Sequence, residues 1–310
     1  MDFQQELKEK VKEAEKTIYS YMPGERQLQA TVIDAMDYTM SAGGKRIRPV
    51  IMRAVYDMLG GGDKLIEPFM AAIEMIHTYS LIHDDLPALD NDDYRRGRKT
   101  AHVVYGEAMA ILAGDGLLNY AYETAAKAFD LIENADKDDV SAISKELETR
   151  KRVEKSLTIL ARNPGIYGMI GGQVADVELT GKTLTKEQLE YIYINKTGAL
   201  IEAAMTIGAV LSGASDSVVD KISQTAYNIG MAFQIQDDIL DETATFEELG
   251  KPIHSDKDCG KVTYVTIHGL DDACEKVKSL SEQAIETINE LSCDGEFLKE
   301  LVRYLISRKN

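Results

Sequence analysis

Cysteine and proline are scarce in this sequence, and tryptophan is absent. Six prolines in 310 residues leave room for long helices, because proline is the residue that most strongly interrupts them. The three cysteines, Cys259, Cys274 and Cys293, are odd in number, widely spaced and contain no Cys-x-x-Cys pair. This pattern argues against a disulfide framework and against a structural zinc site.

Long hydrophobic runs are also missing. No stretch approaches the roughly 18 consecutive apolar residues that a membrane-spanning helix needs. The first 16 residues read as a charged amphipathic helix and lack the apolar segment of a signal peptide. We therefore expect a soluble, cytoplasmic protein.

Basic residues are outnumbered, with 35 lysines and arginines against 52 acidic residues and a formal net charge of −17. A field of this sign repels nucleic acid and anionic membrane surfaces, so both are disfavoured as partners. A small anionic substrate would need metal ions or a local basic cluster to reverse the sign within its site.

What the sequence has in abundance is helical periodicity. Apolar residues recur every three or four positions, whereas alternating patterns typical of strands are rare. The expected helical stretches are 32–40, 49–59, 68–83, 107–133, 186–212, 217–240 and 273–307. We expect breaks at Gly43-Gly44, 60–62, Leu86-Pro87, Gly171-Gly172 and 242–260. Residues 134–154 form a solvated helix or loop, and Tyr264–Ile267, the best strand candidate, a loop or helix start. With no linker or repeat, we predict one all-α bundle over residues 1–310.

One acidic cluster lies at the end of the apolar stretch 217–240. Asp237 and Asp241 are four residues apart, so their side chains lie on one helix face about 6 Å from each other. Asp238 is rotated from them by roughly 100°. Such a face presents the hard oxygen ligands that magnesium prefers, together with phosphate oxygens and water.

The acidic cluster that comes first along the chain, Asp84-Asp85-x4-Asp90, ends the apolar stretch 68–83, and the cluster at 237–241 is the second. Asp84 and Asp90 are six positions apart, which an unbroken helix would place on different faces. Pro87 provides a break that would bring Asp90 back round, and Asp93 is an alternative ligand. A single such cluster is usually a solvated helix end. Two of them bordering buried surface require cationic compensation, because unpaired acids there cost several kcal/mol.

Basic residues are concentrated at two places. Residues 94–99 read Tyr-Arg-Arg-Gly-Arg-Lys directly after the first acidic cluster, and residues 43–49 read Gly-Gly-Lys-Arg-Ile-Arg-Pro. They either neutralise neighbouring acids or bind diphosphate oxygens, for which arginine is well shaped. Lys196 and Lys251 are two further candidates, and either could be an ordinary surface lysine.

Taken together, these motifs resemble those of the trans-isoprenyl diphosphate synthases (polyprenyl synthetases), from about Gly43 to Tyr264. The two acidic clusters look like the family's two aspartate-rich motifs, the first in its form with a two-residue insertion. The other matching segments are 43–49, Arg95-Arg96, Gly172-Gln173, Lys196-Thr197 and Phe233-Gln234.

The resemblance implies an all-α fold around a deep central cavity, usually in a homodimer, with three Mg²⁺ ions between the acidic clusters and an allylic diphosphate. The implied metal ligands are Asp84, Asp85, Asp90, Asp237, Asp238 and Asp241. Arg95, Lys196 and Lys251 would bind the allylic diphosphate. Lys45, Arg48, His77 and Arg96 would bind isopentenyl diphosphate. Thr197 and Gln234 would face the developing allylic cation.

The implied reaction is head-to-tail condensation of isopentenyl diphosphate with dimethylallyl or geranyl diphosphate. Tyr79, five residues before Asp84, would form the floor of the product cavity and stop growth at farnesyl diphosphate. The small neighbours Thr78 and Ser80 leave room for longer products, and Tyr79 could equally be a core residue. Geranylgeranyl diphosphate synthase is the main alternative.

Three other helical proteins are less consistent with the sequence. A terpene cyclase normally carries an Asn/Asp–Ser/Thr–Glu pattern at its second site instead of a repeated aspartate motif. A di-iron bundle needs two Glu-x-x-His units, and only Glu74-x-x-His77 occurs. Non-catalytic partner subunits of prenyl synthases tend to lose the aspartate motifs, which are both present here.

Overall fold

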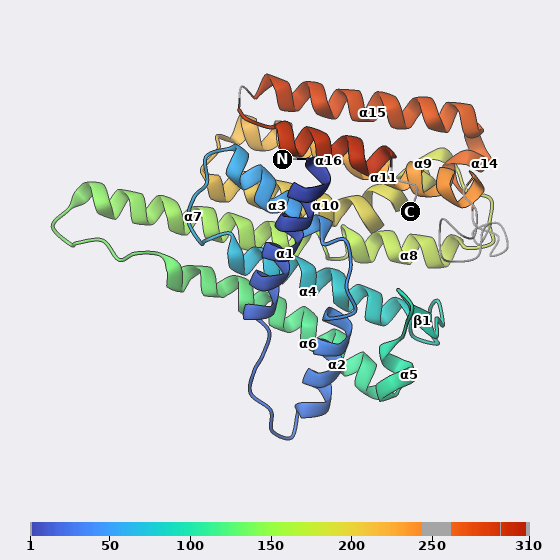
Figure 1. Ribbon diagram of the computed structural model, residues 1–310, viewed down its shortest axis with the longest axis horizontal. Helices are drawn as coiled ribbons and strands as arrows, with labels where there is room; N and C mark the ends of the chain where they lie inside the picture. The colour runs from blue at the N-terminus through green and yellow to red at the C-terminus, as the bar shows by residue number, and fades with distance from the viewer. Residues whose placement is uncertain (1, 244–261, 292, 308–310) are drawn as a thin grey trace. The chain divides into compact units, whose positions relative to one another are not determined.

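The computed structural model describes residues 2–243, 262–291 and 293–307, and this part of the chain is almost entirely helical (Figure 1). The two described strands, β1 (Tyr94–Arg95) and β2 (Arg98–Lys99), pair antiparallel, with Tyr94 opposite Lys99. The all-α prediction is confirmed. Of the described helices, none is long and apolar enough to span a membrane.

The described helices are α1 (Phe3–Ser20), α2 (Ala30–Met40), α3 (Ile47–Met58), α4 (Glu67–Asp84), α5 (Ala101–Tyr105), α6 (Glu107–Ala126), η1 (Lys127–Leu131), α7 (Val140–Arg162), α8 (Met169–Leu179), α9 (Lys186–Ile192), η2 (Tyr193–Gly198), α10 (Ala199–Ser212), α11 (Asp216–Thr243), α14 (Tyr264–His268), α15 (Leu270–Glu290) and α16 (Glu296–Ser307).

The chain divides into two compact units. Unit 1 comprises residues 1–53 and 62–157, and unit 2 comprises residues 54–61 and 158–310. Helices α3 and α7 each cross the boundary between them. A single domain over residues 1–310 stays a prediction.

Helix α4 is the core helix of unit 1. Its side chains are apolar on nearly every face, and Phe69, Ile73 and Ile76 are completely buried. Helices α1, α2 and α6 surround it, with α6 packed along both α4 and α2. Burying so many large side chains stabilises this arrangement by roughly 1.5–3 kcal/mol per side chain. The helix that ends in the first acidic cluster is therefore the most firmly packed one in its unit.

Unit 2 is built around α10, which is buried over most of its length, including Leu200, Met205 and Ile207. Helix α11 packs against α10 and α15, and α16 packs against α15. Helix α11, labelled in Figure 1, has 28 residues and ends at Thr243, so the second acidic cluster lies in its last two turns.

One predicted break is wrong. Gly171 and Gly172 lie inside α8, and the structure gives a physical reason for them. A Cβ atom on Gly172 would lie 2.2 Å from the backbone nitrogen of Lys196. Glycine at this position permits a close approach of two helices instead of ending one.

Other boundaries differ in smaller ways. The stretch 273–307 is two helices, since α15 ends at Glu290 and α16 begins at Glu296. Residues 132–139 form a loop and α7 begins at Val140, so segment 134–154 is both loop and helix. The segment Tyr264–Ile267 is helical, as α14. Most of the predicted break at 242–260 lies outside the described residues.

Candidate active site

The predicted site residues fall into two groups, one in each unit, and the first group begins where α4 ends. Asp84 is the last residue of α4, and the chain then turns so that the Asp90 amide donates to the Asp84 carbonyl at 2.9 Å. The predicted turn at Pro87 is thus confirmed, and Asp90 returns to the end of the helix. Asp84 is half-buried and Asp90 is exposed. Both offer carboxylate oxygens near one helix end, which suits a magnesium ion that completes its shell with phosphate and water.

Asp85 differs from its neighbours because its side chain is buried. The Arg95 Nε donates to its carboxylate at 2.6 Å. Burial raises the pKa of Asp85, Arg95 opposes that rise, and the nearby Asp92 and Asp90 add to it. Through this ion pair, the β1–β2 hairpin is joined to the acidic turn.

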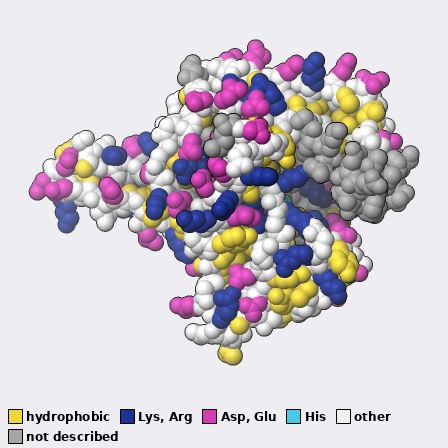
Figure 2. Space-filling model, in the orientation of Figure 1, with side chains coloured by type: hydrophobic (Ala, Val, Ile, Leu, Met, Phe, Trp, Pro, Cys, Tyr) yellow, Lys and Arg dark blue, Asp and Glu magenta, His cyan; other side chains and the backbone are white. Residues whose placement is uncertain are grey.

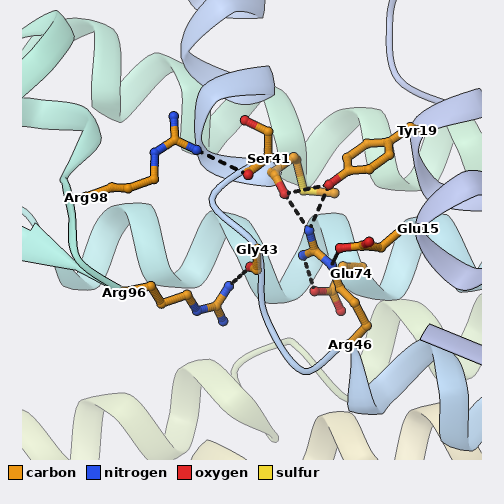
Figure 3. A network of polar contacts seen from close by, with 9 residues as sticks. Glu15, Tyr19, Ser41, Gly43, Arg46, Glu74, Arg96 and Arg98 are labelled. Atoms are coloured by element: carbon orange, nitrogen blue, oxygen red, sulfur yellow. Dashed lines mark hydrogen bonds and ion pairs between the residues drawn. The ribbon is translucent and has the colours of Figure 1, made fainter. Parts of the chain in front are cut away.

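The glycine-rich segment before α3 is fixed by an inward-pointing arginine (Figure 3). Arg46 is 3% exposed and adopts a left-handed backbone conformation, with φ +49°. Its guanidinium donates to Glu74 at 2.7 Å, to Glu15 at 3.3 Å, to the Tyr19 hydroxyl at 3.2 Å and to the Met40 carbonyl at 2.5 Å. Glu74 is 2% exposed, so its pairing with Arg46 explains how an acid is tolerated within α4. This pairing also removes the remaining support for a di-iron site at Glu74.

The hairpin holds the same segment from the other side. Arg96 donates to the Gly43 carbonyl, and Arg98 donates to the Ser41 carbonyl at 3.2 Å (Figure 3). The Arg98 guanidinium also lies 4.4 Å from the ring centroid of Tyr38. Two basic segments that are about 50 residues apart in the sequence are therefore adjacent in unit 1.

Arg48 and His77 lie within this basic cluster. Arg48 has a buried Nε without a hydrogen-bond partner among the described residues, and burial lowers its pKa. Burial lowers the pKa of His77 well below 6.5, and Arg48, Arg96, Arg46 and Arg95 lower it further, in that order. Burial and the surrounding arginines both disfavour the charged form of His77, and a buried guanidinium donor without a partner among the described residues can bind an anion.

Tyr79, the predicted floor of the product cavity, is a buried residue, and its role as a floor stays a prediction. Tyr79 is 5% exposed, and its ring packs edge-on against His83 at 5.8 Å between centroids. Burial, then Tyr122 and Asp84, raise the pKa of Tyr79 to about 12, so its phenol is neutral. Ser80 is half-buried and donates to the His77 carbonyl at 2.9 Å. Lys45 is exposed in the glycine-rich segment.

In unit 2 the three acids of the second cluster are not equivalent. Asp237 and Asp241 are half-buried on α11, while Asp238 is only 4% exposed. Asp238 accepts hydrogen bonds from the Tyr193 hydroxyl and from the Tyr264 amide, the latter at 2.7 Å. The predicted shared face thus carries Asp237 and Asp241.

Lys196 and Thr197 lie on the π-helical segment η2. The Lys196 ammonium lies 2.5 Å from a carboxylate oxygen of Asp176 on α8, and the Thr197 hydroxyl donates to the Gln234 side-chain oxygen at 2.8 Å. These residues, with Tyr193 and Asp238, line a cavity of about 120 Å³. The two polar side chains that were expected to face a cation are therefore joined to each other at its wall.

Two glycine contacts hold η2 in place. Gly172 of α8 lies against the Lys196 backbone, and a Cβ on Gly230 of α11 would lie 2.9 Å from the Cα of Gly198. Both contacts bring backbone against backbone, so η2 packs closely against α8 on one side and α11 on the other. A π-helical turn is uncommon and often marks a functional position.

Within the described ranges, no three acidic, histidine or cysteine side chains are grouped closely enough to hold a metal by themselves. A magnesium site that takes further ligands from a diphosphate and from water does not require such a group. Lys251 lies outside the described residues.

Sequence reasoning missed three residues that shape the site: Arg46, Asp176 and Tyr193. The signal for Arg46 was Glu74, an acid in an otherwise apolar stretch, which needs a buried basic partner. Asp176 lies one helical turn after Gly172, and both meet Lys196 from α8. Tyr193 gave no signal that distinguishes it from a core aromatic residue.

Comparisons with known proteins agree on one family. A family model described as polyprenyl synthetase matches residues 29–305. The chain is 41% identical to a farnesyl diphosphate synthase from Geobacillus stearothermophilus, over 88% of this chain and 87% of that protein. It is also 41% identical to a geranylgeranyl diphosphate synthase from Cyanophora paradoxa, over 90% and 88%. The crystal structure of a geranyltransferase from Legionella pneumophila superposes with a TM-score of 0.81 at 28% identity, covering 99% and 97% of the two chains.

Proposed function

Because the chain belongs to the polyprenyl synthetase family and is a prenyltransferase, we propose that it makes farnesyl diphosphate. In this reaction, isopentenyl diphosphate condenses head to tail with dimethylallyl or geranyl diphosphate. The observation that carries the proposal is the basic cluster of unit 1, where the Arg48 Nε is buried without a partner among the described residues and His77 is kept neutral.

The basic cluster would bind isopentenyl diphosphate. Lys45, Arg48 and Arg96 donate to its diphosphate, and His77 adds a neutral N–H donor or, once the anion is bound, a charged one. The ion pair of Arg46 with Glu74 fixes the backbone of the segment that carries Lys45 and Arg48. Binding by a pre-formed cluster holds the nucleophilic double bond in place and converts an encounter into an effectively intramolecular step.

The allylic diphosphate would be bound by Arg95, Lys196 and Lys251, and three Mg²⁺ ions by Asp84, Asp90, Asp237 and Asp241, with Asp85 beside them. Carboxylate oxygens in these positions fit the ion, which when bound neutralises the charge that develops on the leaving diphosphate. Lys196 takes up part of the same charge. Thr197 donates its proton to Gln234, so its oxygen lone pairs are available to stabilise the allylic cation.

The apolar helix faces exclude water from the cation. Proton loss from the condensed product completes the reaction, with the released diphosphate as the base. The product tail would extend along α4 until it meets Tyr79, one turn beyond His83, which gives a farnesyl product. The second candidate is a geranylgeranyl product, because relatives with either name are equally similar to this chain.

We propose further that the enzyme is a cytoplasmic homodimer. The thiols of Cys274 and Cys293 are free, as expected in a reducing compartment. Exposed apolar side chains occur on α5 and α6, which pack together: Val103, Val104, Ile111 and Leu112 are 38–48% exposed. Figure 2 shows hydrophobic side chains gathered over the part of unit 1 that carries α5. A second copy of the chain would cover this surface.

The decisive experiment is an elongation assay. The purified protein is incubated with Mg²⁺, isopentenyl diphosphate and either dimethylallyl or geranyl diphosphate, and the products are sized by chromatography after dephosphorylation. We expect a main C15 product from both starters and none when the metal is removed with a chelator. A main C20 product would replace the farnesyl assignment, and no elongation with either starter would overturn the proposed function.

A further inference from the structure

Asp238 is more deeply buried than the other two acids of its cluster. Asp237 precedes it and Asp241 follows one turn later on α11, and both are half-buried. Asp238 is rotated by about 100° from Asp237 and is 4% exposed. A carboxylate buried to this degree is costly unless hydrogen bonds satisfy it.

The hydrogen bonds that satisfy Asp238 come from the protein itself. The Tyr193 hydroxyl donates to its Oδ2, and the Tyr264 amide donates to the same oxygen at 2.7 Å. The Tyr264 amide also lies 3.1 Å from the Tyr193 hydroxyl, so the three groups form one closed cluster. Hydrogen bonds to a charged acceptor are roughly twice as strong as those between neutral groups.

The cluster joins three elements. Asp238 belongs to α11, Tyr193 is the first residue of η2, and Tyr264 begins α14, whose cap is the Thr263 side chain. Three and four residues after Tyr193 come Lys196 and Thr197. Asp238 therefore fixes the start of the segment that carries these two residues, and turning Asp238 inward directs Asp237 and Asp241 to another face of α11.

We infer that Asp238 is a positioning residue and not a magnesium ligand: it orients η2 and α14 through Tyr193 and the Tyr264 amide. This inference rests on the proposed function and corrects the ligand set that the family resemblance implies, leaving Asp237 and Asp241 as the metal face of α11. Since Oδ2 already accepts two hydrogen bonds, metal coordination through it would require the cluster to open.

The first test compares metal binding by Asp238→Asn and Asp237→Asn. Bound Mn²⁺ is counted by electron paramagnetic resonance in the presence of inorganic diphosphate, so the readout does not depend on turnover. For Asp238→Asn, which keeps an oxygen acceptor, we expect unchanged stoichiometry and an affinity within about threefold of the wild type. For Asp237→Asn we expect at least one ion fewer or an affinity more than tenfold weaker, as is typical when a metal-site group is lost. Equal losses in the two variants would overturn the inference.

The second test uses Tyr193→Phe, which removes one hydroxyl and leaves the ring packed. If Asp238 acts through Tyr193, Asp238→Ala and Tyr193→Phe each lower kcat about tenfold or more with metal stoichiometry unchanged, and the double variant is no worse than Asp238→Ala. Asp238→Asn should recover most of the kcat. If the fold-losses in kcat of the two single variants multiply in the double variant, Asp238 and Tyr193 act independently, which would contradict the shared cluster. Thermal unfolding of each variant identifies any that fail to fold. An inactive wild type would overturn the proposed function, whereas the Mn²⁺ comparison would still decide the role of Asp238.

Discussion

At the scale of single residues, adjacent bases in the glycine-rich segment have opposite roles. Arg46 is buried and bound to Glu74, Glu15, Tyr19 and the Met40 carbonyl, whereas Lys45 is exposed. The sequence placed both in one basic string, and only the buried acid Glu74 hints at the difference. Assignment of substrate contacts from the string alone would treat a structural arginine as a ligand.

We predict that Arg46→Met lowers the free energy of unfolding by about 3–5 kcal/mol, because it leaves the Glu74 carboxylate buried and unpaired. Lys45→Met, the matched control, should change stability by less than about 1 kcal/mol and instead raise the KM for isopentenyl diphosphate. Urea unfolding followed by circular dichroism measures the first effect, and steady-state kinetics the second. Similar stabilities for the two variants would contradict the assignment.

Tyr79 gives a prediction about product length. Replacing it with alanine removes a buried ring next to His83 and opens space below the acidic turn. We expect Tyr79→Ala to shift the main product from C15 to C20 or longer. Tyr79→Phe keeps the ring and should leave the product unchanged. The measurement is the chain length of the products made from geranyl diphosphate. An unaltered product distribution for Tyr79→Ala would show that Tyr79 does not limit product length.

His77 gives a prediction about pH. Its folded pKa lies well below the ordinary value of 6.5, so well above pH 6.5 the residue is neutral in both the folded and the unfolded chain and does not affect stability. As the pH falls through 6.5, the unfolded chain takes up a proton that the folded chain does not, and stability is lost. Urea unfolding at pH 7.5 and 5.5 should therefore show a smaller acid-induced loss for His77→Gln than for the wild type. His268→Gln, outside the basic cluster, serves as control and should retain the full loss.

At the scale of elements, the sequence predicted the features that local apolar spacing determines and missed those that depend on contacts between distant segments. The helices, the acidic helix ends and the turn at Pro87 were predicted because apolar spacing and proline act locally. Gly171-Gly172 was misjudged because the reason for Gly172 is a neighbour, η2, that is distant along the chain. The β1–β2 hairpin was not predicted, since its two-residue strands carry charges instead of an alternating pattern.

In the candidate site, too, local patterns predicted some features, and contacts between distant segments determined the others. Residue types and spacing indicated which side chains take part, and the structure brings Thr197 to Gln234 and the two basic segments together. Spacing placed Asp238 about 100° of rotation away from Asp237, but it could not show which groups Asp238 contacts. Their difference arises from Tyr193 and the Tyr264 amide, which no local pattern identifies.

At the scale of the whole molecule, the homodimer can be tested through the exposed apolar residues of α5 and α6. We predict that Leu112→Glu converts a dimer into a monomer, because a charge at an apolar interface loses its hydration without gaining a partner. Light scattering after gel filtration measures the mass. Ile166→Glu alters an apolar side chain that is 66% exposed in unit 2 and should leave the dimer intact. A wild-type mass near 34 kDa would refute the dimer.

The π-helical segment η2 has a consequence for how the length of this chain can vary. A π-turn holds one more residue than an α-turn, so deleting Ile194 would allow regular α-helical bonding and rotate Tyr193 and α9 by about 100° relative to Lys196 and α10. Tyr193 would then point away from Asp238, and the hydrogen bond that fixes the start of η2 would be lost. Such a shortened protein should keep its helical circular dichroism signal and lose prenyl transfer. A deletion of one residue in η2 is therefore compatible with helix formation but not with activity.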